Sequence, residues 1–238
     1  MHELRKATSA LFEGHALAAH KMLTRVSRIE TTLVHTWDVL QTLTPDEYQE
    51  FRPVVGREGA SGFQSYQYRM LEFILGVKQR QRRFLRPDGS HATVDVFDIH
   101  GADADATRDL ELAWKGPAVY DAAVSLLASR FPEFGIEPQR DFSQSYARSA
   151  PVFTAWKAVY EDAEGHMDLF QLGEKLVDVE DTFRQWRFRH LTTVSRIIGF
   201  DAGTGGSSGV EYLLEVATES IRQPLFVELW EVRHALLA

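Results

Sequence analysis

The spacing of apolar residues along the chain is helical almost throughout. Between residues 22 and 40, and again between residues 167 and 198, apolar side chains recur three or four positions apart, which places them on one face of an α-helix and suits no strand. In the first segment they are Met22, Val26, Ile29, Leu33, Trp37 and Leu40. In the second they are Leu172, Leu176, Val179, Phe183, Trp186, Val194 and Ile197, with His190 in the same series. The pattern predicts two long helices whose stripes face a core.

Local signals set the ends of several helices. A new helix is expected to begin with Thr44 as its N-cap, Pro45 at the first helical position and Glu47 as the acid of a capping box. The helix from residue 22 should therefore stop near residue 43. A short helix should follow and end at Pro53. Another should span residues 63–75 and end at Gly76.

Further helices are predicted over residues 117–130, 151–162, 210–222 and 224–237, the last opened by a proline. Residues 87–106 are the least helical part, because turn formers flank a short β-branched stretch from Thr93 to Ile99, which predicts a small hairpin or an ordered loop. The chain shows no internal repeat and no linker. We therefore expect one all-α domain over 1–238, a helical bundle with a small non-helical insertion near 87–106.

Composition excludes several classes of protein. The 238 residues contain 26 basic and 34 acidic side chains, a net charge of −8, and no cysteine. Disulfides, thiolate nucleophiles and iron–sulfur clusters are thus excluded. The acidic balance argues against nucleic-acid binding, no apolar run could span a membrane, and without a signal sequence the expected location is cytoplasmic. The basic run from Lys78 to Arg86 is interpreted as the solvated end of a helix, with an anion site as the alternative.

His190 falls on the apolar stripe of the second long helix, so its imidazole should point inward. One interpretation is a core histidine satisfied by a hydrogen bond, and the other is a ligand. Four arginines on the same helix suit a buried anion, such as the propionates of a haem, better than a plain core. They are Arg184, Arg187, Arg189 and Arg196.

Two other features could bind a small molecule. The segment from Gly203 to Gly209 has four glycines and three hydroxyl residues, so its backbone could approach a ligand closely, although a flexible turn is the alternative and it matches neither familiar phosphate-loop pattern. Tyr48 and Arg52 lie four positions apart and share a helix face. The planar guanidinium of Arg52 suits an amino-acid carboxylate, unless it merely stacks on Tyr48 at the surface.

Together these features resemble the tryptophan 2,3-dioxygenase family of helical haem enzymes. The resemblance runs from His2 to about residue 220 and is carried by LTPDEYQEFR around Tyr48, by SGFQSYQYRMLEFILG from Ser61, and by DVEDTFRQWRFRHLTTVSRIIGF and GTGGSSGVEYL between Asp178 and Leu213. It implies a haem b cofactor in a helical pocket, L-tryptophan and O₂ as substrates, N-formyl-L-kynurenine as the product that begins the kynurenine pathway, and a homotetramer.

The resemblance also implies a role for individual residues. His190 would be the proximal ligand of the haem iron, Arg52 would bind the tryptophan carboxylate beside Tyr48, and Thr204 would hydrogen-bond the substrate. Ser61 would lie near the haem edge, and Gly203 and Gly205 would let the loop approach the cofactor.

One departure from the family concerns the segment ahead of His2-Glu3-Leu4-Arg5. In the family that segment supplies a distal histidine over the haem, and the printed sequence has no counterpart of it. No catalytic residue is therefore assigned, and we expect either a shortened form of a longer protein or a relative that has lost half of its pocket. The alternatives are a haem-binding relative that acts on another aromatic substrate or is inactive, and a helical scaffold without a cofactor.

Overall fold

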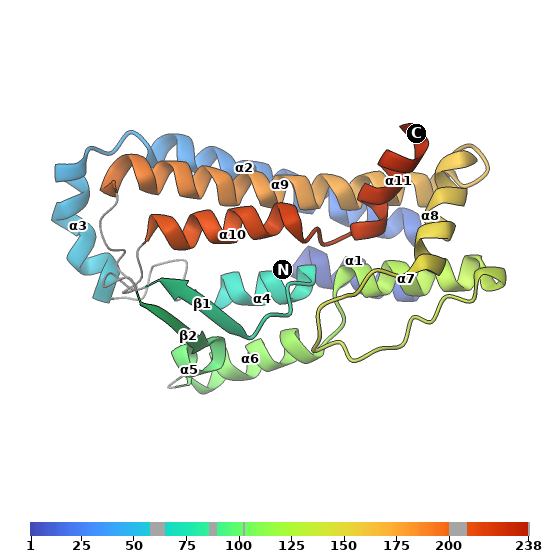
Figure 1. The fold of residues 1–238 in the computed structure, drawn as a ribbon, viewed down its shortest axis with the longest axis horizontal. Helices are drawn as coiled ribbons and strands as arrows, with labels where there is room; N and C mark the ends of the chain where they lie inside the picture. The colour runs from blue at the N-terminus through green and yellow to red at the C-terminus, as the bar shows by residue number, and fades with distance from the viewer. Residues whose placement is uncertain (58–64, 86–89, 102, 200–208, 238) are drawn as a thin grey trace.

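Helices account for most of the chain, and two of them run along its length (Figure 1). The computed structural model describes residues 1–57, 65–85, 90–101, 103–199 and 209–237. Along the chain these form α1 (His2–Phe12), α2 (Ala16–Leu40), α3 (Pro45–Arg57), α4 (Tyr66–Leu75), β1 (Gln81–Leu85), β2 (His91–Asp95), α5 (Val96–His100), α6 (Ala104–Lys115), α7 (Val119–Arg130), a 3₁₀ turn (Pro132–Phe134), α8 (Ala150–Glu161), α9 (Met167–Ile198), α10 (Val210–Arg222) and α11 (Val227–Leu237). The predicted all-α class is confirmed.

Helix α9 organises the bundle. It packs along α2 on one side and against α10 on another, while α3 crosses its C-terminal end (Figure 1). Its bounds and those of α10 match the predicted ranges. Its apolar stripe is buried as predicted, with Leu172, Leu176 and Val179 fully enclosed. This agreement follows from an uninterrupted three-and-four spacing over many turns.

The predicted apolar stripe of α2 is confirmed only in part: Val26 is buried and Met22 and Trp37 are half-buried, but the other three residues are exposed. Ile29, Leu33 and Leu40 are 54%, 44% and 42% exposed, and the buried face of this helix consists of Val26 together with Ala16, Ala19, Leu23 and Glu30. The helix begins six residues before the first residue of the predicted stripe, and its alanines let neighbouring helices approach this face closely. It ends at Leu40 rather than near residue 43.

Prolines mark two of the predicted helix boundaries incorrectly. Helix α3 continues through Pro53 to Arg57, since a proline removes one backbone hydrogen bond without necessarily ending a helix. Its predicted start is confirmed, because a Glu47 carboxylate oxygen accepts hydrogen bonds from the Thr44 backbone N–H at 2.8 Å and from its hydroxyl at 2.9 Å. Helix α11 begins at Val227 and not at Pro224.

The predicted hairpin exists, but it is shifted toward the N-terminus. Strands β1 and β2 are antiparallel, with Gln81 opposite Asp95 and Leu85 opposite His91, so β1 precedes the expected range. The residues after Asp95 form α5 instead of continuing the strand, because the Asp95 side chain caps the helix by accepting from the Phe97 N–H at 2.8 Å. Gly76, with a φ of +113°, ends α4 as predicted.

The basic run is not the solvated end of a helix. It lies on the approach to β1 and on the strand itself, and Lys78 and Arg82 are only 4% and 6% exposed. The Lys78 ammonium donates to the backbone carbonyls of Ala113 at 2.8 Å, Trp114 at 3.1 Å and Gly116 at 2.7 Å, which closes the C-terminal end of α6. Burial lowers the pKa of Lys78 to about 8.

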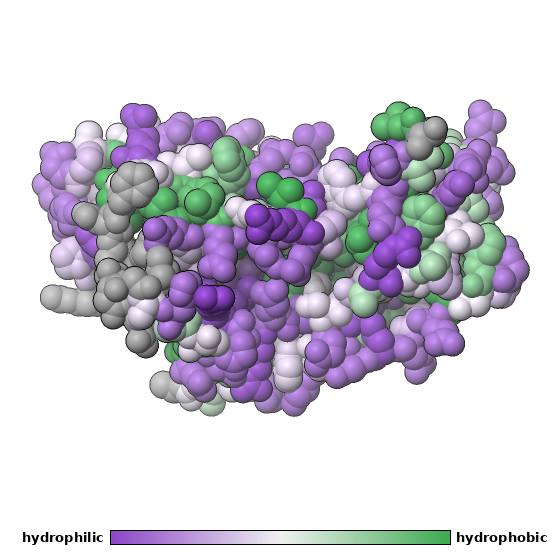
Figure 2. Space-filling model, viewed as in Figure 1, coloured by the Kyte–Doolittle hydropathy of each residue, from purple (hydrophilic) through white to green (hydrophobic). Residues whose placement is uncertain are grey.

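The surface over α9 and α10 includes apolar side chains (Figure 2). Phe188, Leu214 and Ile221 are 59%, 53% and 70% exposed there. Within the described ranges, no helix is both long enough and apolar enough to cross a membrane.

Candidate functional site

His190 points inward from α9, as predicted. Its ring stacks on Trp37 of α2, with centroids 4.6 Å apart and planes 15° from parallel. Trp186, one turn earlier on α9, contacts it with centroids 5.2 Å apart. The imidazole therefore lies half-buried against a wall of two indoles from two helices.

The state of this imidazole suits a metal ligand. Burial lowers the pKa of His190 to about 4, so the ring is neutral at physiological pH and keeps a nitrogen lone pair. In the described part of the chain neither ring nitrogen has a hydrogen-bond partner, whereas a structural core histidine normally uses one. No group of three or more metal-binding side chains occurs among the residues described. A single free imidazole fits a cofactor that supplies the other ligands of its own metal.

The predicted substrate residues Tyr48 and Arg52 lie on α3, at the end of the bundle where α9 finishes (Figure 1). Both side chains are half-buried, and their spacing of four residues places them on one face of the helix. The predicted positions Ser61, Gly203, Thr204 and Gly205 lie outside the described residues. Of the predicted site, the structure thus brings α3 and its two side chains to the end of α9 that carries His190.

A buried charge cluster that the sequence did not reveal lies close to His190. The Glu72 carboxylate on α4 is 0% exposed and accepts hydrogen bonds from Arg69 at 2.7 Å, Arg82 at 2.8 Å and Arg187 at 2.8 Å. Arg187 also donates to the Tyr68 hydroxyl at 3.1 Å. We refer to Glu72 and its three arginines as the Glu72 cluster.

The Glu72 cluster carries more positive than negative charge. Burial by itself would raise the pKa of Glu72, but Arg82, Arg69 and Arg187 hold it down at about 2. Three guanidinium groups, each at least nine-tenths buried, thus surround one carboxylate. The Nε of Arg82 is buried without a hydrogen-bond partner among the described residues. A buried site with surplus positive charge favours a neighbouring anion.

Aromatic contacts join this cluster to His190. The ring of Tyr68, which is hydrogen-bonded to Arg187, contacts Trp186 with centroids 5.2 Å apart. Trp186 in turn contacts His190 at the same centroid distance. In the sequence, Arg187 and Arg82 belong to two separate groups of basic residues that could serve an anion. A further signal is Arg69 three residues before Glu72, a spacing that permits an ion pair within one helix.

Two of the four arginines of α9 contact a buried carboxylate, Arg187 at Glu72 and Arg184 at Glu180, which is 1% exposed. Arg184 pairs with Glu180 of its own helix, and Arg189 pairs with Asp38 on α2. The Nε of Arg196 donates to the backbone carbonyl of Gln41 at 3.1 Å. Arg189 and Arg196 thus point to α2 and its C-terminal end, because a helix turns consecutive positions to different sides.

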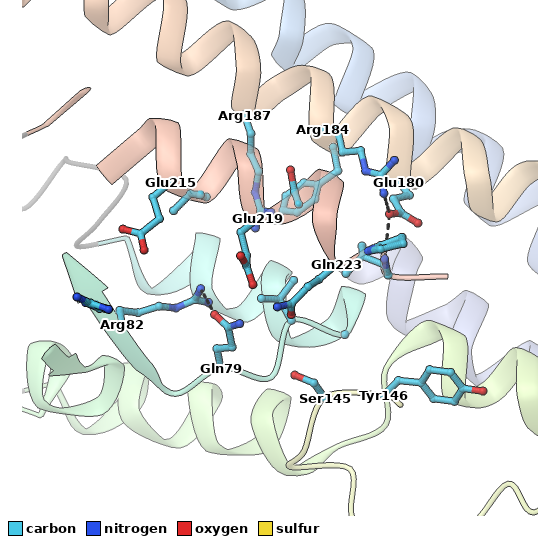
Figure 3. Close-up of a pocket in the computed structure, with 18 of the residues that line it drawn as sticks. Gln79, Arg82, Ser145, Tyr146, Glu180, Arg184, Arg187, Glu215, Glu219 and Gln223 are labelled. Carbon is cyan, nitrogen blue, oxygen red and sulfur yellow. Dashed lines mark hydrogen bonds and ion pairs between the residues drawn. The ribbon is translucent and has the colours of Figure 1, made fainter. Parts of the chain in front are cut away.

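A cleft of about 390 Å³ lies on the outer side of the Glu72 cluster, between β1, α9 and α10. Figure 3 shows Arg187 reaching toward it from α9, Glu215 and Glu219 from α10, and Arg82 from β1. Neither His190 nor the two predicted residues of α3 line it. As far as the described residues go, this cleft is therefore separate from His190, Tyr48 and Arg52.

Comparison with known proteins gives a consistent result. A family model described as tryptophan 2,3-dioxygenase matches residues 1–156 and 119–236. A protein from Polaromonas sp. named tryptophan 2,3-dioxygenase is 46% identical over 234 residues, which cover 98% of this chain and 73% of that protein. Proteins of the same name from Bacillus thuringiensis and Burkholderia pseudomallei are 44% and 46% identical, cover 99% of this chain, and are themselves covered to 78% and 71%.

Proposed function

The chain belongs to the tryptophan 2,3-dioxygenase family, and we propose on that premise that it binds haem b and inserts both atoms of O₂ into the C2–C3 bond of L-tryptophan. The product is N-formyl-L-kynurenine, the first intermediate of the kynurenine pathway. The observation that carries this proposal is the neutral, inward-facing imidazole of His190, which has no hydrogen-bond partner in the described chain.

The residues around His190 fit a haem. Its free imidazole nitrogen would hold the iron, and the two indoles beside it offer an apolar wall to a flat macrocycle. The surplus positive charge of the Glu72 cluster, one aromatic ring away from Trp186, would favour the negatively charged propionates. When bound, haem supplies the iron chemistry that activates dioxygen. The protein supplies the axial nitrogen, the electrostatics and the position of the substrate.

The substrate would be held from α3 and the loop before α10. Arg52 would bind the tryptophan carboxylate through its planar guanidinium, with Tyr48 shaping the pocket beside it. Thr204 would hydrogen-bond the polar end of the substrate, Ser61 would lie near the haem edge, and Gly203 and Gly205 would allow close approach of the backbone. Fixing the substrate before reaction is the entropic part of catalysis. Both oxygen atoms end in the product, so no external reductant is consumed.

We also propose that the protein works as a homotetramer. The exposed Phe188, Leu214 and Ile221 support association, because large apolar side chains gathered on a surface commonly mark protein contacts.

The test is an absorption spectrum of the protein produced with a haem supply, before and after L-tryptophan and O₂ are added to the ferrous form. We expect a haem band, followed by the absorbance of formylkynurenine. His190→Ala should lose stable haem binding. Arg52→Ala should keep its haem but raise the KM for tryptophan, because a charge-assisted hydrogen bond worth about 1.5–3 kcal/mol is removed.

Two outcomes would contradict these roles. A normal haem spectrum in His190→Ala would exclude His190 as the ligand. A parallel loss of haem in Arg52→Ala would show that Arg52 serves the cofactor site and not the substrate.

A further inference from the structure

We propose that Glu72 is a positioning residue for His190, and that through Arg82 it makes the β1–β2 hairpin part of the cofactor site. This inference rests on the proposed function, because it takes His190 as the iron ligand. It is carried by the hydrogen bonds that meet at one buried carboxylate from three elements of the fold.

Both oxygens of Glu72 are used, and they connect different elements. Oε1 accepts from Arg187 of α9. Oε2 accepts from Arg69 of α4 and from Arg82 of β1. Since the carboxylate is fully buried and bonded on both oxygens, a movement of any one of these elements breaks a charged hydrogen bond in a medium that does not replace it with water.

Arg187 transmits this constraint to the ligand. It lies three residues before His190, nearly one helical turn and about 4.5 Å along the axis of α9. Its guanidinium is held by Glu72 and Tyr68 and lies 4.3 Å from the ring centroid of Phe183. These contacts fix the rotation of α9 at this turn, and the rotation decides the direction in which the imidazole points.

A second set of contacts acts in the same sense. Tyr68, which accepts a hydrogen bond from Arg187, packs on Trp186, and Trp186 packs on His190. The same guanidinium therefore constrains the ligand through the backbone of α9 and through two aromatic rings. Such partners of a metal ligand tune its orientation without touching the metal.

Arg82 gives the hairpin its part in this arrangement. It is the second residue of β1, opposite Val94 of β2, and only 6% of it is exposed. One end of its guanidinium donates to Glu72 and the other to the Gln79 side chain at 3.3 Å. A hairpin needed only as a connection would have no reason to bury an arginine.

The competing explanation is that Glu72 contributes stability alone, and Glu228 of α11 provides the matched control. It is also 0% exposed and accepts hydrogen bonds from the Tyr120 and Tyr146 hydroxyls at 2.8 and 2.9 Å and from the Ser149 N–H at 2.7 Å. None of these partners belongs to α4, β1 or α9. Glu228→Gln should therefore weaken the fold without disturbing the ligand.

The experiment compares the haem-loaded wild type with Glu72→Gln, Arg82→Met and Glu228→Gln. It measures the rate of haem transfer to apomyoglobin, the electron paramagnetic resonance spectrum of the ferric form and the urea unfolding midpoint. We expect Glu72→Gln to weaken haem binding about 10- to 100-fold, as loss of a partner behind a metal ligand does, and to alter the ferric spectrum. Arg82→Met should change the haem transfer rate and the ferric spectrum in the same direction as Glu72→Gln does, but to a smaller extent. Glu228→Gln should lower the midpoint and leave both haem readouts unchanged.

Equal haem transfer rates and spectra in Glu72→Gln and Glu228→Gln would overturn the inference while leaving the proposed function intact. If Glu72→Gln fails to fold, Arg82→Met decides, because it removes only one of the three arginines. An unchanged transfer rate and spectrum in Arg82→Met would then exclude the role of the hairpin. Failure of the wild type to bind haem would instead overturn the proposed function and this inference with it.

Discussion

Glu72 and Glu30 are both buried glutamates, yet their pKa values are shifted in opposite directions. Glu72 is 0% exposed and its pKa is held at about 2, whereas Glu30 of α2 is 5% exposed and burial raises its pKa to about 8. The difference lies in their partners. Glu72 meets three arginines, while neither oxygen of Glu30 has a hydrogen-bond partner within the described chain. At neutral pH the first is a buried anion and the second is mostly a buried neutral acid.

Removing the carboxylate of Glu72 should produce the largest loss of stability. Glu72→Ala leaves three buried guanidinium groups without their shared counter-charge, and breaking a buried ion pair from one side costs about 3–5 kcal/mol. We expect the free energy of unfolding, measured in urea at pH 7, to fall by that amount. Glu30→Ala is the matched control, because it removes a similarly buried carboxyl group that accepts no hydrogen bond from the described residues. A loss below about 1 kcal/mol for Glu72→Ala would mean that water replaces the carboxylate.

The raised pKa of Glu30 predicts how the stability of the fold depends on pH. Its folded pKa of about 8 lies above the unfolded value near 4.5, so stability should fall as the pH rises between these values, by about 1.4 kcal/mol per unit, and level off above pH 8. Glu30→Gln removes this slope. The variant should match the wild type at pH 4.5 and be more stable at pH 8.

The measurement is the difference between the two unfolding curves at each pH. Taking this difference removes the contributions of other titrating groups, which are the same in both proteins. One of them is His190, whose lowered pKa makes stability rise with pH between about 4 and 6.5. The ammonium group of Met1 attracts the Glu30 carboxylate and opposes its shift. A wild type and variant that run in parallel across this range would show that Glu30 ionises normally.

The smallest effect should come from the surface. Arg189 and Asp38 join α9 to α2, as Arg187 and Glu72 join α9 to α4, but their side chains are 34% and 50% exposed. Asp38→Asn should therefore lower the free energy of unfolding by only about 0.2–1 kcal/mol. In high salt, which screens exposed charges, even this difference should disappear. Urea unfolding at low and high ionic strength tests this. A loss of stability as large as that of Glu72→Ala would contradict the distinction between buried and exposed ion pairs.

The sequence predicted the helices well and the charged interior poorly, for physical reasons. The bounds of α9 and α10 followed from long apolar periodicity, and the inward direction of His190 followed from the same stripe. The face of α2 was misassigned in part, because its buried positions include alanines and a glutamate, which carry little hydrophobic signal. The Glu72 cluster joins residues 10 and 115 positions apart, and local spacing holds no information about such pairs. The roles of Ser61, Gly203, Thr204 and Gly205 remain predictions.

Gly76 shows how handedness can restrict a position that has room for a side chain. A Cβ atom added there would meet only the Cβ of Ala118, at 3.6 Å, which is ordinary contact, so volume does not exclude a larger residue. The φ of +113° restricts the position instead, because a left-handed backbone costs an L-residue about 1–2 kcal/mol. This cost is smallest for asparagine. Over evolutionary time this position can drift to asparagine at modest cost. It can become valine or isoleucine only if the chain between α4 and β1 takes another path.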